Sequence, residues 1–225
     1  MPQILQNDYP EKLHPLIRLG ARGTGYQDPL PYREKFELSE SDELELLRLA
    51  QDCRFDELNC GNPAVWAPFH ATRALGQVGG ADLVEPLLTL LNSVEEDDDS
   101  MHEAIPQALA WIGPAALAHV DAAMFDPNLN SQAKASLTGF YAELVLKHPN
   151  TRPLAVKSLV GIISNFAKFE SSTNGLVISY LIDFQVKEAL PTIRFAYLSN
   201  CVDETVLGDF DDVVEAMETL PSGKS

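Results

Sequence analysis

The chain has 225 residues, of which 45% are hydrophobic, so it is long and apolar enough for one larger domain or a short array of repeats. Its formal net charge is −17, and its 16 Lys and Arg residues are scattered singly along the sequence. Because such a surface repels nucleic-acid phosphates and anionic lipid head groups, the charge indicates a soluble protein or one that meets basic partners, and it disfavours binding to nucleic acid or a membrane.

Residues 1–62 are richer in turn formers and less periodic than the remainder, which predicts an N-terminal arm and helical cap belonging to the same domain. A short helix is expected over residues 11–19, ended by Gly20 in a left-handed conformation. Loop-forming residues follow, and Gly23-Thr24-Gly25 lacks the Gly-Lys-Ser/Thr ending of a phosphate-binding loop.

A second helix is predicted after residues 39–42, because Ser39 or Ser41 can accept backbone N–H bonds and acidic residues favour the positive end of a helix. We expect Leu44, Leu47 and Ala50 to face inward from this helix. The run from Asn59 to Pro63, which contains Cys60 and Gly61, then breaks the chain.

From Pro63 onward the pattern becomes regular. Four leucines, each inside an apolar helical stretch, lie 34, 35 and 37 residues apart, at Leu75, Leu109, Leu144 and Leu181. Small residues near the expected contacts, such as Gly76 and Ala108, would let neighbouring helices approach closely. A period of 33 to 40 residues with two helices in each unit is typical of an α-solenoid, whose units bury their apolar faces against one another.

Prolines and turn formers support the same period. Prolines fall near the start of the second helix of a pair at Pro86, Pro153 and Pro191, and the matching position of the second repeat holds Val120. Turn formers follow the first helix of each pair, at Gly79-Gly80, Gly113-Pro114, His148-Pro149-Asn150 and, more weakly, Gln185. Residues 156–163 have the β-branched content of a strand, but their apolar spacing favours a helix.

We therefore predict an all-α fold, a right-handed α-α superhelix of the HEAT/armadillo-like solenoid type. The repeat array would cover residues 63–225 with about four helix pairs and an acidic C-terminal cap.

The stretch Val65–Gly76 resembles the opening of HEAT-like repeats in a group of uncharacterised bacterial proteins, and Val84–Leu91 is similar to the second helix of that repeat. The resemblance covers roughly residues 30 to 214 and continues at residues 97–99, 103–106, 112–116, 202–204 and 208–213. It implies a HEAT-like fold and, more distantly, a relation to the repeats of phycobilin lyases. Some members of the class end in a cysteine-rich zinc tail, whose ligands are missing from residues 219–225.

Trp66, His70 and Arg73 recur at i, i+4 and i+7 on one face of the first regular helix. Such a face could bind a partner, because Trp and Arg are frequent anchors of protein interfaces. The alternative is that Trp66 packs on the N-terminal arm and His70 is a satisfied interior polar group.

Five consecutive carboxylates, from Glu95 to Asp99, fall between the first and second full repeats. Their mutual repulsion predicts a solvated loop that also caps the next helix, and the ligand order of an EF-hand is missing. His102 and Glu103 follow and could join His70 in a metal site, but nothing in the sequence fixes their spacing, so we predict no metal and no cofactor. The candidate interaction surface takes four residues from this stretch: Asp97, Asp98, Asp99 and Glu103.

The run from Asp203 to Glu218 is rich in carboxylates and holds no basic residue. It predicts either the edge of an acidic groove, for which Asp209 and Asp211 are the candidates, or the polar outer cap that a terminal repeat needs for solubility.

No arrangement of residues points to catalysis. A Gly-x-Ser-x-Gly motif is missing, and the histidines have no Ser or Cys partner at a telling spacing. Cys60 could be a reactive thiol, but an ordinary one is expected. The sparse cysteines, an N-terminus unlike a signal peptide and the lack of a long apolar run predict a cytoplasmic protein.

Three functions stay open from the sequence. The first is a non-enzymatic protein-interaction or scaffold module whose acidic surface takes a basic or extended partner. The second, implied by the resemblance, is a small-molecule or bilin-binding protein of the lyase kind. The third is a helical-repeat nucleic-acid binder, which the charge disfavours.

Overall fold

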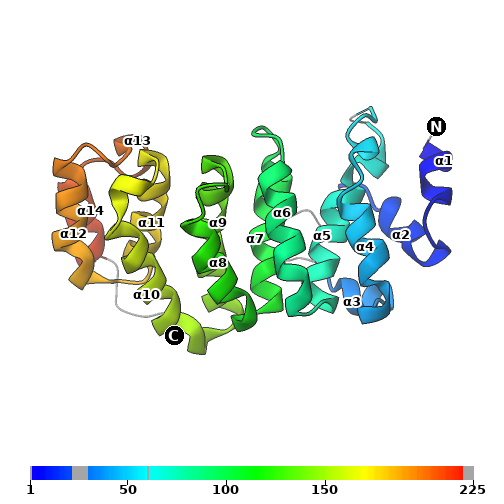
Figure 1. Ribbon diagram of the computed structural model, residues 1–225, viewed down its shortest axis with the longest axis horizontal. Coiled ribbons are helices and arrows are strands. Elements are labelled where there is room, and N and C mark those ends of the chain that lie inside the picture. Colours follow the sequence, from blue (N-terminus) through cyan, green and yellow to red (C-terminus); the bar gives the residue numbers. More distant parts are fainter. Residues whose placement is uncertain (1, 22–29, 60, 220–225) are drawn as a thin grey trace. The chain divides into compact units, whose positions relative to one another are not determined.

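The structure is a computed structural model that describes residues 2–21, 30–59 and 61–219, and these residues form helices and turns without a strand (Figure 1). The predicted all-α class is therefore confirmed for this part of the chain. Packing divides the chain into two compact units, Met1–Ala116 and Leu117–Ser225. The expected boundary between residues 62 and 63 falls inside the first unit, where α4 (Glu43–Ala50) packs against α5 (Ala67–Val78).

The N-terminal unit is organised around α5. Its other helices are α1 (Pro2–Asn7), α2 (His14–Ile17), α3 (Tyr32–Lys35), α4, α6 (Val84–Ser93) and α7 (Asp99–Ile112). Helix α5 packs against α2, α3, α4 and α7, and its side chains are buried around almost the whole circumference. A helix enclosed on all sides must satisfy any polar side chain that it carries inside the unit.

Helices α5 and α7 approach each other closely at Gly76. A Cβ atom at this position would lie 2.6 Å from the Cα atom of Ala108 and 2.8 Å from its carbonyl oxygen. Contacts this short do not occur between real side chains and backbone, so the approach requires glycine. The expected role of small residues at the helix contacts is confirmed here.

The C-terminal unit consists of two rows of helices. They are α8 (Leu117–Met124), α9 (Ser131–Lys147), α10 (Arg152–Ile163), α11 (Ser171–Asp183), α12 (Leu190–Leu198), α13 (Glu204–Leu207) and α14 (Phe210–Thr219). Helix α10 packs against α8 and α12 in one row, and α11 packs against α9 and α14 in the other. Each row also packs on the other through pairs such as α9 with α10 and α12 with α14.

The predicted turns are confirmed. Gly79-Gly80 separates α5 from a 3-10 turn that leads into α6, and the 3-10 turns before α8 and α10 begin at Pro114 and Pro149. Gly113 has a φ of 94° and Gln185 a φ of 55°, so both end a helix with a left-handed residue. Residues 156–163 lie in α10, which confirms the helix predicted there.

The N-terminal predictions hold in part. Residues 11–17 form a 3-10 turn and the short α2, and Gly20 has the expected positive φ of 66°. Ser39 caps the start of the helical segment that follows it, as predicted, and the Asp42 carboxylate accepts from the Ser39 backbone N–H in return at 2.8 Å. The prediction for Leu44 is wrong, because this side chain is 76% exposed and Leu46 faces the core in its place. The expected loop over 22–29 and the thiol of Cys60 lie outside the described residues.

Among the described residues, no single helix is long and apolar enough to cross a membrane. Two consecutive segments, Asp99–Ile112 and Pro114–Phe125, reach that length and apolarity only when taken together across the break at Gly113.

Candidate interaction surface

His70 is a satisfied interior group of the N-terminal unit. Its Nδ1 atom accepts a hydrogen bond from the Tyr32 hydroxyl at 2.7 Å, and its Nε2–H donates to the carbonyl oxygen of Gly20 at 2.7 Å. Burial, reinforced by the positive charge of Arg73, lowers the pKa of His70 to about 4. Burial also raises the pKa of Tyr32 to about 12, so the hydroxyl keeps the proton that it donates.

Arg73 is also inside the unit, with 2% of its surface exposed. Its Nη2 atom donates to the Glu103 carboxylate at 2.8 Å, which joins α5 to α7. The guanidinium lies 4.4 Å from the centre of the Phe69 ring, and that ring also meets the rings of half-buried Trp66 and of His70 edge-on. The structure thus brings Arg73 and Glu103 together. It buries the side chains of both His70 and Arg73, so this helix face does not present them to a partner. For His70 this is the alternative given above, a satisfied interior polar group.

The acidic loop before α7 has a structural use. The Asp98 carboxylate accepts a hydrogen bond from the Met101 backbone N–H at 3.1 Å and so caps α7, while Asp97 and Asp99 are exposed. His102 hydrogen-bonds through Nε2 to the carbonyl oxygen of Glu95 at 3.1 Å. Within residues 2–21, 30–59 and 61–219, no group of three or more His, Cys, Asp and Glu side chains is placed to hold a metal ion.

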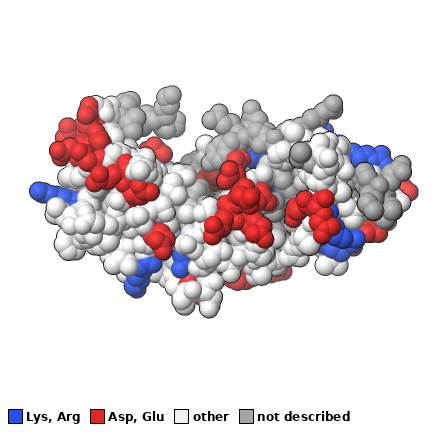
Figure 2. Space-filling view, turned by 90° about the horizontal axis from the view of Figure 1, so that it is seen from above, with Lys and Arg blue, Asp and Glu red and all other residues white. Residues whose placement is uncertain are grey.

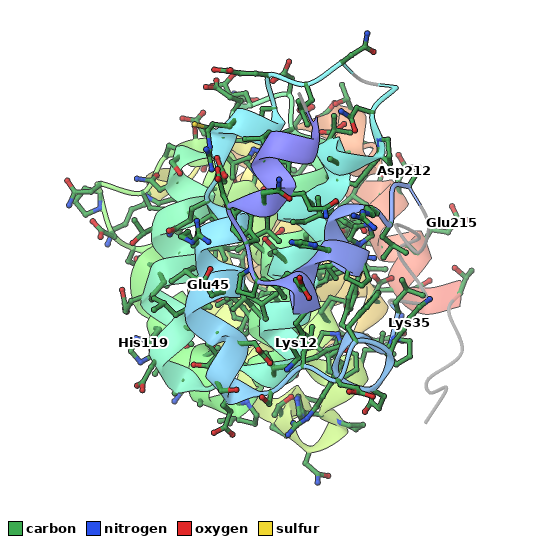
Figure 3. The ribbon with its side chains drawn as sticks, turned by 90° about the vertical axis from the view of Figure 1, so that its right-hand side faces the viewer. Lys12, Lys35, Glu45, His119, Asp212 and Glu215 are labelled. Atoms are coloured by element: carbon green, nitrogen blue, oxygen red, sulfur yellow. The ribbon has the colours of Figure 1, made fainter. Side chains whose placement is uncertain are left out.

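Asp209 and Asp211 lie in the C-terminal unit, where α14 begins. The Asp209 carboxylate accepts from the backbone N–H groups of Asp211 and Asp212 at 2.8 and 3.1 Å, and the Asp212 carboxylate accepts from the Asp209 N–H at 2.9 Å. This reciprocal cap fixes the start of α14, and the exposed Asp212 and Glu215 lie along the outer side of the helix (Figure 3).

An apolar ridge runs along the outer side of α12. Phe195 is 63% exposed and Leu198 is 72% exposed, and Pro191 continues the same side one turn earlier. The ring of Phe195 meets that of Phe166 edge-on, with centroids 5.7 Å apart. Apolar side chains that are exposed next to one another, instead of scattered singly, are a feature of interaction sites.

The ridge separates two cavities. One, of about 540 Å³, has mainly apolar walls that include Phe166, Ala167, Pro191 and Phe195, with Lys168 at its rim. We call the ridge and its two cavities the α12 surface.

The second cavity, of about 280 Å³, is acidic. It is lined by the carboxylates of Glu204, Asp209 and Asp211, the rings of Tyr197 and Phe210, and Arg194 and Leu198. The pKa of Tyr197 is raised to about 12, first by burial and then by the neighbouring carboxylates of Glu204, Asp209 and Asp212. Figure 2 shows acidic side chains gathered at the end of the view that carries α12 and α14 in Figure 1, with basic side chains at its edge.

The buried side-chain amide of Asn174 hydrogen-bonds to the backbone on both sides of the α12 surface. Asn174 in α11 has no exposed surface, and its Nδ2 atom donates to the carbonyl oxygens of Phe166 at 3.0 Å and Cys201 at 2.8 Å. Phe166 lies in the apolar cavity, and Cys201 lies in the turn between α12 and α13. One interior side chain therefore connects the turns on both sides of the ridge.

Sequence reasoning selected Asp209 and Asp211 but missed Phe195 and Leu198. Apolar residues of a helix are normally assigned to the core, and the buried Ile193 and Ala196 already fill that role in α12. One signal for their exposure is the number of apolar residues in α12. A helix that buries one face can place Ile193 and Ala196 on that face, and Phe195 and Leu198 then fall outside it.

Comparison with protein-family models, with curated proteins and with solved structures gives no match to this chain. The resemblance to HEAT-like repeats therefore stays a prediction.

Proposed function

We propose that the chain is a non-enzymatic protein-interaction module, built as a HEAT-like α-solenoid, whose acidic surface takes a basic or extended partner. The observation that carries the proposal is the α12 surface. It combines exposed Phe195 and Leu198 with the carboxylates of Glu204, Asp209 and Asp211 on one unit. Apolar anchors surrounded by charge are the usual composition of a protein-binding site.

The packing of the C-terminal unit supports the solenoid part of the proposal. Helices α8, α9 and α10 each contact the next helix in the chain, and contacts with the next helix but one join α8, α10 and α12 in one row and α9 and α11 in the other. This is the contact pattern of stacked helix pairs, and it agrees with the leucine period of 34 to 37 residues in the sequence.

Quantitative affinity capture from an extract of the native source tests the proposal. The baits are the wild-type chain, a triple variant with Glu204→Gln, Asp209→Asn and Asp211→Asn, and a control with Glu170→Gln, Asp183→Asn and Glu188→Gln. The control removes the same number of exposed charges from the same unit. Asparagine at position 209 retains a capping side chain for α14.

Wild type and control should recover the same basic proteins in about 50 mM salt, where surface charges are poorly screened, and the triple variant should lose them. Equal recovery by the triple variant, or recovery by wild type no greater than that by beads without bait, would contradict the proposed function.

A further inference from the structure

We infer that the α12 surface binds a short basic segment of another protein, which places an apolar side chain in the apolar cavity and a Lys or Arg side chain in the acidic cavity. The inference rests on the proposed function and assigns its site and the chemistry of its partner.

The apolar half of the surface has space and shape for an anchor. The cavity of about 540 Å³ is larger than any single side chain, and the edge-on rings of Phe166 and Phe195 form its aromatic wall. Phe195 in the wall of this cavity and Leu198 beside it on the ridge leave most of their surface in water, so a Leu, Phe or Trp side chain that fills the cavity and reaches the ridge would remove apolar area from solvent on both sides.

The acidic half selects the sign of the partner's charge. Glu204, Asp209 and Asp211 supply three carboxylates to the cavity, and among the described residues that line it Arg194 is the one basic residue. A cation would relieve the repulsion among these carboxylates, and a further carboxylate would increase it. A second copy of this chain is a poor occupant, because a two-fold contact would bring the same acidic cavity of each copy to one interface and the net charge of each copy is −17.

The positions of the lining residues set the spacing. In α12 the apolar cavity takes Pro191, Thr192 and Phe195, and the acidic cavity takes Arg194, Tyr197 and Leu198, about one turn further along. One turn advances roughly 5 Å, and the cavities lie on either side of a helix about 10 Å wide, so their centres are about 10 Å apart. An extended chain advances about 3.3 Å per residue, which places the anchor and the basic residue about three positions apart.

Fluorescence anisotropy with synthetic peptides tests this inference on the full chain. The first probe is a labelled Gly/Ser peptide of about twelve residues, with one Trp and an Arg-Lys pair three positions later. Matched peptides replace the Trp by Ser or the Arg-Lys pair by Gln. The peptide with both features should bind at least about tenfold more tightly than either matched peptide, as expected when a single anchor carries much of the binding energy.

Variants locate the binding. Phe195→Ser and Leu198→Ser should each weaken binding of the first probe at least about tenfold, and Leu146→Ser, which changes a side chain 73% exposed elsewhere in the same unit, should leave it unchanged. Asp209→Asn with Asp211→Asn should weaken binding and flatten its dependence on salt. Circular dichroism verifies that each variant is folded.

Each contrary outcome identifies what is wrong. Equal binding without the Trp, or unchanged binding to Phe195→Ser, would overturn the anchor and its location. Sedimentation that reveals a dimer of the wild type, lost in Phe195→Ser, would make a second copy the occupant. Failure of every peptide to bind would sink the inference. The proposed function would survive this failure if capture from the extract still needed Glu204, Asp209 and Asp211, and both would fall if capture failed as well.

Discussion

Mild acid should destabilise the N-terminal unit through His70. The folded protein holds this imidazole neutral, with a pKa of about 4, while a histidine in the unfolded chain has a pKa of about 6.5. Protonation would remove the lone pair that accepts the Tyr32 hydrogen bond and would place a second cation beside Arg73. Between these two pKa values the unfolded chain binds a proton that the folded chain does not.

The direction and size of the effect follow from this difference. Stability from the neutral His70 is fully present above about pH 6.5 and declines as the pH falls towards 4, because protons favour the unfolded chain over that interval. Relative to pH 8, the loss from this one group is about 2 kcal/mol at pH 5 and approaches 3 kcal/mol at pH 4.

Urea unfolding of wild type and His70→Gln at pH 8, 6.5 and 5 measures the loss. Carboxylates contribute to both proteins, so the difference in unfolding free energy between the two isolates the histidine. We expect glutamine to be destabilising at pH 8 and its disadvantage to shrink by about 2 kcal/mol at pH 5. NMR of the imidazoles follows the protonation of His70 directly, and the exposed His119 serves as a comparison signal in the same spectra (Figure 3).

Two results would refute this reasoning. One is a His70 resonance that titrates near pH 6.5, and the other is a stability difference between wild type and variant that does not change with pH.

Three further substitutions, measured by urea or thermal unfolding, test a helix contact, a helix propensity and a buried hydrogen bond. Gly76→Ala should destabilise by about 2 kcal/mol or more because its Cβ would lie 2.6 Å from the Ala108 backbone, whereas Gly161→Ala in α10, with nothing within 4 Å, should stabilise by about 1 kcal/mol through helix propensity. Equal effects of the two alanines would contradict the close approach of α5 and α7. Asp121→Ala removes the carboxylate that accepts from the buried Tyr141 hydroxyl at 2.9 Å and should cost about 2 kcal/mol, and an unchanged stability would show that this hydrogen bond contributes nothing.

Turn chemistry allowed much of the fold to be predicted. Gly113 and the His148-Pro149 pair act through local backbone preferences, which do not depend on what lies elsewhere in the chain, and the helices end where these residues indicate. Helix register was less certain where apolar residues are dense. In α4, leucines at 44, 46, 47 and 49 allow more than one inward face, and tertiary packing selected Leu46 and Leu49.

The candidate site was harder to predict, because burial of a polar residue depends on its partner. Nothing local in the sequence pairs Arg73 with Glu103 across 30 residues, or His70 with Tyr32 across 38. The sequence therefore assigns the charged Arg73 to the surface and the exposed Leu44 to the core. Both errors have one cause, which is that hydropathy describes a side chain and not the contacts available to it.

Because the Asn174 amide hydrogen-bonds to the turns on both sides of the α12 surface, a substitution at this interior position would change that surface. Aspartate at position 174 would have nearly the same shape, but it would set a carboxylate against the carbonyl oxygens of Phe166 and Cys201 instead of a donor. If the α12 surface binds the proposed segment, a genetic screen for loss of binding should therefore recover changes at Asn174, although this side chain has no exposed surface. If the proposed partner binds there, the sequence of the α12 surface is constrained by the interior Asn174 amide as well as by contact with that partner.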